Sequence, residues 1–352
     1  MLNTKLLKGV VVGGLLLSFP QVAGAESRPR NADSATYYLS LGKEQEIARK
    51  YSEAWRYFDK AASFDPTNVE AQVSIAEVCT KMNKMAPAIQ ALNEVVKLRP
   101  DDGKALLKLG KLYFNFSQWD KVIAIMPKVQ QQLPDAKNVA YMLGKSYYSI
   151  ENYGKALEYL QQAVKEDEEN GDAYYLIAHT YTTMSNYKQA IPFYERSLKL
   201  DQQTSYETRV YEFAMVLATA GKFDESIVWF QKALDKGYKA RDDFYTNFAY
   251  TLADAHKTDK AIEMMEEMLK RRPTDIQLIN GMADVCYHSG KYKEAINYWD
   301  KLISLDEHNA RPIYQIGMAY IKLGNVKDGQ QLCDKAIAMD PSLAVLRHEK
   351  RM

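Results

Sequence analysis

The sequence lacks a charge imbalance, a cysteine framework and the glycine and proline content of a loop-rich protein. Its 352 residues carry 46 basic and 45 acidic side chains, a formal net charge of +1. The chain therefore offers no polybasic signal for nucleic acid or anionic lipid, and we predict no nucleic-acid partner. Three cysteines are too few for a disulfide framework, and 17 glycines with 11 prolines are too few for a chain dominated by turns.

Long hydrophobic runs are also absent. The apolar run from Val10 to Phe19 is too short to be a good membrane span. It follows Lys5 and Lys8 and precedes the tripeptide Ala23-Gly24-Ala25, which is the order of charged, apolar and small residues in a signal peptide. We therefore expect residues 1–25 to be a signal peptide and the chain to be exported, with an uncleaved anchor as the alternative. Cleavage would leave no integral membrane segment.

A repeated spacing organises the rest of the chain. Pro66, Pro100 and Pro134 lie 34 residues apart, and each follows one helical apolar pattern and precedes another. Extending this spacing, with two residues inserted before Glu207 and one before Asp242, gives nine units. These units are residues 35–68, 69–102, 103–136, 137–170, 171–204, 207–240, 242–275, 276–309 and 310–343. Residues 26–34 read as a flexible leader, and residues 344–352 as a short C-terminal capping helix.

Large and small side chains recur at fixed positions of the units. Position 7 is always large and apolar, position 8 is always glycine or alanine, position 20 is small, and position 24 is large in all units except the last. In the fourth unit these residues are Leu143, Gly144, Ala156 and Leu160. Small residues let two helices approach closely while large ones fill the space beside them, so each unit is predicted to be a helix hairpin.

These columns resemble the tetratricopeptide repeat, whose pattern over 34 residues is W-x2-L-G-x2-Y, A-x3-F and P. The first unit matches with Tyr38, Leu41, Gly42, Ala54, Phe58 and Pro66, and the match extends over residues 35–343. The resemblance implies an all-α fold, a right-handed superhelical solenoid of helix-turn-helix repeats. It also implies that the first helices line a concave wall and the second helices a convex one. The seventh unit departs from the pattern, because Thr258 stands at position 17 in place of an aromatic residue.

Catalytic motifs are absent from the sequence. It contains no glycine-rich phosphate loop, no G-x-S-x-G elbow and no H-E-x-x-H helix. None of the five histidines lies three or four residues from another, so no helical metal pair is present. The cysteines, Cys79, Cys286 and Cys333, fall on packing columns. We expect no enzyme activity, no cofactor and no metal.

Tyrosine is the residue type that stands out, with 25 copies. The resemblance places positions 2, 5, 9, 12 and 13 of each unit on the concave wall. Seven tyrosines occupy such positions, which we call the tyrosine row: Tyr141, Tyr148, Tyr175, Tyr211, Tyr250, Tyr287 and Tyr314. A polar, positive zone joins them in the third and fourth units: Lys104, Lys111, Lys145, Asn115 and Asn138. Tyrosine suits interfaces because it has a rigid apolar body and a polar tip, but the row could equally fill space between repeats.

We therefore predict a scaffold that holds an extended peptide segment of a partner protein, in the bacterial periplasm and in envelope assembly or secretion. A glycan-binding module of a polysaccharide export or uptake system is the alternative, motivated by the tyrosine row alone. An acidic segment or a carboxylate would suit the lysine zone.

Overall fold

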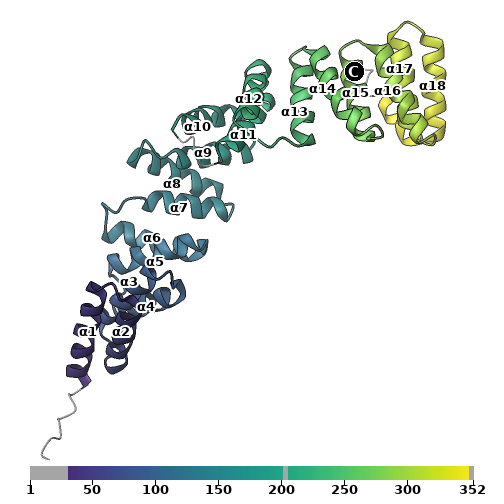
Figure 1. Cartoon of the computed structure of the whole chain (residues 1–352). Helices are drawn as coiled ribbons and strands as arrows, with labels where there is room; N and C mark the ends of the chain where they lie inside the picture. Colours follow the sequence, from purple (N-terminus) through teal and green to yellow (C-terminus); the bar gives the residue numbers. More distant parts are fainter. Residues whose placement is uncertain (1–30, 201–204, 349–352) are drawn as a thin grey trace, which may run out of the picture. The chain divides into compact units, whose positions relative to one another are not determined.

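Helices follow one another in antiparallel pairs along the chain (Figure 1). The structure is a computed structural model that describes residues 31–200 and 205–348. Within these ranges every regular element is a helix, which confirms the predicted all-α fold built from helix hairpins. The predicted signal peptide, residues 26–30 of the leader and the last four residues of the cap lie outside the described residues.

Each predicted unit contains one pair of helices. The first helices are α1 (Asn31–Ile47), α3 (Val69–Lys81), α5 (Gly103–Asn115), α7 (Val139–Ser149), α9 (Gly171–Thr183), α11 (Tyr206–Thr219), α13 (Asp242–Asp254), α15 (Ile276–His288) and α17 (Ala310–Lys322). The second helices are α2 (Tyr51–Phe64), α4 (Met85–Leu98), α6 (Trp119–Gln132), α8 (Tyr153–Glu166), α10 (Tyr187–Leu200), α12 (Phe223–Asp235), α14 (Thr258–Arg271), α16 (Tyr292–Leu305) and α18 (Val326–Met339). The chain divides after Ala105 into two compact units.

The leader is shorter than the sequence suggests. Helix α1 begins at Asn31, so residues 31–34 are helical and are not part of a flexible segment. Ser34 is buried at 5% exposure and Ala35 at 1%, which ties this turn to the fold. Asp33 in the first turn favours the helix start, because a carboxylate stabilises the positive end of the helix dipole.

The turn inside every hairpin has the same backbone conformation. The residue at position 15 of each unit has a positive φ between 54° and 90°. It is glycine in three units and a residue with a side chain in the other six: Arg49, Asn83, Ser117, Glu151, Ser185 and His256. A single left-handed residue ends a helix and redirects the chain, so the hairpins share one turn although their turn sequences differ.

The predicted packing columns meet between the two helices of a hairpin. A Cβ placed on Gly144 would lie 2.7 Å from Cγ of Leu160 and 3.0 Å from its backbone nitrogen. Gly42 faces Phe58, and Gly110 faces Met126 in the same way. Phe58, Met126 and Leu160 are all fully buried, so the small residue on one helix makes room for the large residue on the other.

The last hairpin is covered by a short cap. A 3-10 turn, η1 (Pro341–Ala344), leads into α19 (Val345–His348). Leu343 is 7% exposed and joins a core cluster with Ile313, Cys333 and Ala336, and Leu346 packs against the same cluster. The cap buries apolar surface of the α17–α18 hairpin.

Candidate functional site

All seven tyrosines of the row lie on first helices of the second compact unit, which begins at residue 106. Tyr141 and Tyr148 are on α7, and α9, α11, α13, α15 and α17 each carry one of the others. Their exposure differs: Tyr250 is 39% exposed, Tyr314 is 4% exposed, and the other five are half-buried. The row is therefore not a uniform surface, and the contacts of each ring show what it does.

A buried arginine connects three successive first helices. Arg209 of α11 is 4% exposed; it donates through Nη2 to Oδ1 of Asp172 on α9, and through Nη1 to Oγ of Ser197 at 3.4 Å. The other carboxylate oxygen of Asp172 accepts a hydrogen bond from the Tyr141 hydroxyl of α7 at 3.2 Å. A charge buried this deeply is stable only when it is paired and hydrogen-bonded, so these contacts fix α7, α9 and α11 against one another.

Tyr175 and His179, both on α9, continue this set of contacts. The guanidinium of Arg209 lies 4.3 Å from the ring centre of Tyr175, in cation–π contact, and His179 meets the same ring edge-on at 5.8 Å. On the other side of His179, Nδ1 lies 2.8 Å from the Tyr148 hydroxyl. We call the connected set the α7–α9–α11 network: Tyr141, Tyr148, Asp172, Tyr175, His179, Arg209 and Glu212.

Glu212 of α11 is the buried carboxyl of the network. Its Oε2 atom is shielded from solvent and meets no hydrogen-bond partner within the described residues. Burial raises the pKa of the Glu212 carboxyl above its ordinary value, and the neighbouring Tyr175, His179 and Arg209 oppose that shift. Burial and the charge of Glu212 together raise the pKa of the Tyr175 hydroxyl, which therefore stays protonated.

Three other tyrosines of the row have packing contacts. Tyr211 lies 4.9 Å from Tyr238 and 5.1 Å from Phe244 between ring centres, and its hydroxyl accepts a hydrogen bond from Asn247 at 2.9 Å. Tyr287 packs on Tyr292 and Trp299. Tyr314 lies in the core cluster beneath the C-terminal cap. For these three the structure supports the alternative interpretation, in which the ring fills space between helices.

Tyr250 differs from its neighbours in the row. Its ring is the most exposed of the seven, and its hydroxyl occupies the place that a Cβ atom would take on Gly281 of the next first helix, α15. A side chain at position 281 would collide with that hydroxyl. The small residue therefore lets Tyr250 lie across α15.

The predicted positive zone is divided. Lys104 is exposed and belongs to the first compact unit, whereas Lys111, Asn115, Asn138 and Lys145 belong to the second. Nζ of Lys145 lies 5.7 Å from the ring centre of Phe114 and 5.9 Å from that of Tyr141. Lys145 therefore borders the α7–α9–α11 network. Asn138 precedes α7 in a left-handed conformation with φ 68°, and its side chain makes no capping hydrogen bond.

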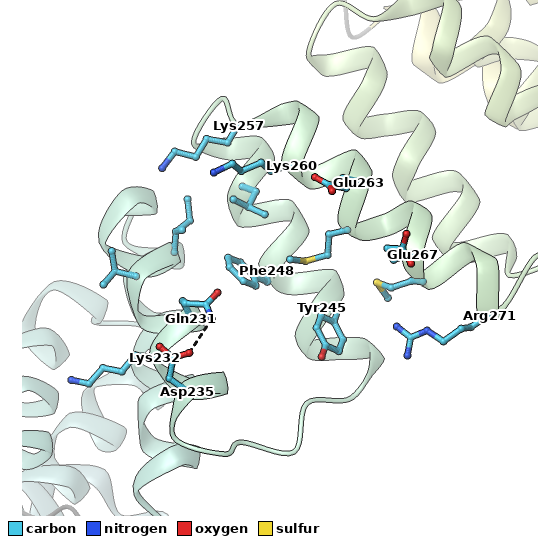
Figure 2. A pocket seen from close by; sticks show the side chains of 15 residues that line it. Gln231, Lys232, Asp235, Tyr245, Phe248, Lys257, Lys260, Glu263, Glu267 and Arg271 are labelled. Atoms are coloured by element: carbon cyan, nitrogen blue, oxygen red, sulfur yellow. Dashed lines mark hydrogen bonds between the residues drawn. The ribbon is translucent and has the colours of Figure 1, made fainter.

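A groove that the sequence did not predict runs between α12, α13 and α14 (Figure 2). Its volume is about 940 Å³, and an ion pair of 2.6 Å between Lys257 and Asp224 joins the starts of α14 and α12. Val228 lines it and is 64% exposed, at position 22, where no other unit has a large apolar residue. Figure 2 shows charged side chains of both signs around it, Lys260 and Glu263 among them. The large apolar residue at position 22, Val228, was the feature of the sequence that could have indicated this groove.

Neither a metal cluster nor a membrane-spanning helix emerges within residues 31–200 and 205–348. No three His, Cys, Asp or Glu side chains in this part of the chain are grouped as metal ligands. None of its helices is both long enough and apolar enough to span a bilayer.

The paired helices, the repeated left-handed turn and the packing columns define the class: an all-α protein of tandem helix hairpins. A tetratricopeptide repeat model matches residues 47–111, and a model described as anaphase-promoting complex, cyclosome, subunit 3 matches residues 123–197 and 254–336. The chain belongs to the tetratricopeptide repeat proteins.

Individual relatives match parts of the chain. The TPR repeat-containing protein YpiA of Bacillus subtilis is 24% identical over 132 residues, which are 38% of this chain and 31% of that protein. The cellulose synthase operon protein C of Pseudomonas fluorescens is 32% identical over 140 residues, which are 37% of this chain and 11% of that protein. The chain thus spans less than a third of either relative.

Solved structures align with about half of this chain at low identity. MamA from Desulfovibrio magneticus is 20% identical with a TM-score of 0.42, over 49% of this chain and 98% of that one. YrrB, described as a TPR protein with an unusual peptide-binding site, is 22% identical with a TM-score of 0.41, over 56% of this chain and all of that one.

Proposed function

We propose that this chain is a non-enzymatic scaffold that binds an extended segment of a partner protein across α7, α9 and α11. The observation that carries the proposal is the α7–α9–α11 network, in which Arg209 and Asp172 hold the rings of Tyr141 and Tyr175 on successive helices. Rings held by buried polar contacts lose little freedom when a partner binds, and this lowers the entropic cost of binding.

The geometry sets the size of the segment. Packed helices lie about 10 Å apart, and an extended chain advances about 3.3 Å per residue. One helix therefore corresponds to roughly three residues of partner, and three helices to roughly nine. Lys145 at the border of the network, with Lys111 and Asn115 on α5, favours acidic or carboxylate-bearing residues at the α5 end of the segment.

Binding tests this proposal directly. The chain is used to recover partners from an envelope extract, the bound segment is mapped with overlapping peptides, and its dissociation constant is measured by fluorescence anisotropy. A double variant, Tyr148→Ala with Tyr175→Ala, is compared with Tyr159→Ala, which removes a half-buried tyrosine from the second helix α8. We expect the double variant to weaken binding at least tenfold and the control to leave it unchanged. Equal binding by both variants would refute the proposal.

We further propose export to the bacterial periplasm and a role in envelope assembly or secretion. The support is the sequence of residues 1–25, with its two lysines, apolar run and small-residue cleavage site. Fractionation of bacteria that express the full chain, with N-terminal sequencing of the product, tests it. Periplasmic protein that starts at Glu26 is expected. Protein that starts at Met1 and stays in the cytoplasm would contradict export.

A glycan is the second candidate partner. It is favoured by the 32% identity over 140 residues to the cellulose synthase operon protein C, although that match covers 11% of the relative. Exposed tyrosine rings can stack on sugars as they do on peptides. A glycan array separates the two candidates. Glycans that bind the unaltered chain but not the Tyr148 and Tyr175 double variant would identify a glycan, and not a peptide, as the partner. An array without hits would remove the glycan candidate.

A further inference from the structure

Two aromatic side chains often meet where a hairpin turns. In three repeats the aromatic residue that opens the second helix, at position 17, packs on an aromatic residue near the end of the first helix, at position 12. Their ring centres lie 5.3 to 6.2 Å apart. The pairs are Phe114 with Trp119, Tyr148 with Tyr153, and Tyr287 with Tyr292. In these repeats the place beside the turn is filled by the protein's own rings.

The seventh repeat has small residues at both of these positions. Position 12 is Ala253 and position 17 is Thr258. Both line a cavity of about 620 Å³, which we call the Ala253–Thr258 cavity. Its other lining residues are Tyr250, Asp254, His256, Asp284, Val285, His288 and Ser289. The cavity therefore lies where those three repeats have their ring pair, and it opens between the first helices α13 and α15.

The walls of the cavity have a definite chemistry. Tyr250 and Val285 supply apolar surface, as does the methyl group of Thr258, whose hydroxyl donates to Ser289 at 2.9 Å. Asp254 and Asp284 bring carboxylates, and Oδ2 of Asp284 already accepts from Asn280 at 3.0 Å. An aromatic ring with a donor at its tip, an indole N–H or a phenol O–H, suits both the shape and these acceptors. An aliphatic side chain would offer these carboxylates no donor.

We infer that the Ala253–Thr258 cavity takes one aromatic side chain, tryptophan or tyrosine, from the bound partner segment. The inference rests on the proposed function and adds its specificity: the partner supplies the ring that the seventh repeat lacks. Three repeats of the same chain show that a ring is stable at this place beside the turn. The cavity opens between the first helices α13 and α15, and the α7–α9–α11 network also lies on first helices, so one extended chain can occupy both.

Small probes test the cavity without knowledge of the partner. The full chain is titrated with N-acetyltryptophanamide, N-acetyltyrosinamide and N-acetylleucinamide, and the methyl NMR signals of Ala253, Thr258 and Val285 are followed. We expect saturable shifts at millimolar concentration with the two aromatic amides, and binding at least tenfold weaker with the leucine amide. Equal binding of all three amides, or none, would overturn the inference, as would cellobiose shifting these signals where the aromatic amides do not.

Matched variants show whether the ring enters the cavity. Thr258→Tyr places the protein's own ring there and should weaken binding of the aromatic amides at least tenfold. Val326→Tyr makes the same kind of change at position 17 of the ninth repeat, outside the cavity, and should leave binding unchanged. Ala253→Phe fills the cavity from the other side and replaces Thr258→Tyr if that variant does not fold. Unchanged binding to a folded, filled variant would refute the inference.

This result can fail separately from the proposed function. Amides that do not bind, together with a partner segment lost by the Tyr148 and Tyr175 double variant, would leave the scaffold in place and remove only the aromatic anchor. If the amides bind but the double variant still binds the partner segment, the aromatic site stays in place and the scaffold proposal is removed.

Discussion

Arg209 and Asp172 form an ion pair across 37 residues of sequence, and the arginine side chain is 5% exposed while the carboxylate is 42% exposed. The pair is thus asymmetric, because water reaches one partner and not the other. The carboxylate also accepts from Tyr141, and the guanidinium also lies over Tyr175. One ion pair therefore orients two rings of the proposed binding surface.

Removing the exposed partner should cost stability. Asp172→Ala leaves the buried guanidinium of Arg209 without its carboxylate; breaking a fully buried pair costs about 3–5 kcal/mol, and access of water to Asp172 lowers this to roughly 1–3 kcal/mol. Arg209→Met removes the charge together with the need to pair it and should cost less. Urea unfolding followed by circular dichroism measures both. An Asp172→Ala midpoint equal to that of the unaltered chain would show that the pair is dispensable.

Two helical glycines should respond in opposite directions to the same change. Gly144→Ala places a methyl group against Leu160, partly against its backbone, and should destabilise by about 1–3 kcal/mol. Gly154→Ala adds a methyl group to α8 with nothing within 4 Å and should stabilise by about 0.5–1 kcal/mol. Thermal unfolding of the two variants side by side checks the sign of each. Shifts of the same sign would contradict the packing of position 8 on position 24.

The repeated turn predicts a stabilising substitution. Glu151 has a φ of 62°, a conformation that costs a residue with a side chain about 1–2 kcal/mol relative to glycine. Glu151→Gly should therefore raise the unfolding midpoint, in spite of the greater freedom of glycine in the unfolded chain. The reciprocal change, Gly221→Ala at φ 77°, should lower it. A midpoint that falls in Glu151→Gly would mean that the side chain contributes more than the turn strain costs.

Glu212 should make stability depend on pH in a defined direction. Burial raises its pKa in the folded chain, so the folded state keeps the proton at a pH where the unfolded state has released it. Stability contributed by the protonated form is then fully present below the unfolded pKa, about 4.3, and is lost as the pH rises through the higher folded pKa. Glu212→Gln has no such proton to lose. The melting temperature of Glu212→Gln, relative to that of the unaltered chain, should therefore increase as the pH rises. A difference between the two melting temperatures that is the same at pH 4 and pH 8 would contradict this.

The sequence predicted what depends on side-chain volume and spacing. The 34-residue spacing, the column of glycine and alanine at position 8 and the large residues at position 24 all correspond to contacts in the structure. These features are predictable because helix hairpins must bury the same apolar stripe in every repeat. The leader boundary could not be placed as well, since polar residues such as Asn31 and Asp33 are as common at a helix start as in a loop.

The polar contacts of the binding surface were harder to predict. Asp172 and His179 occupy concave columns, so their positions were visible, but a column does not show which partner a side chain meets. Arg209 and Glu212 stand at positions 3 and 6, outside those columns, and their roles depend on burial and on residues about 35 positions away. The Ala253–Thr258 cavity left a trace in the sequence as two small residues at positions 12 and 17, where three other repeats have an aromatic residue at both positions.

Photocrosslinking shows whether the partner lies on the first helices or on the second helices. A photoreactive amino acid is introduced at Lys145, beside the α7–α9–α11 network on a first helix, or at the exposed Lys188 on the second helix α10, and the expressing cells are irradiated. We expect position 145 to crosslink to one short segment of a single partner and position 188 to give no such product. The Tyr148 and Tyr175 double variant should abolish the crosslink at position 145. Crosslinks from position 188 alone would place the partner on the second helices and contradict the account.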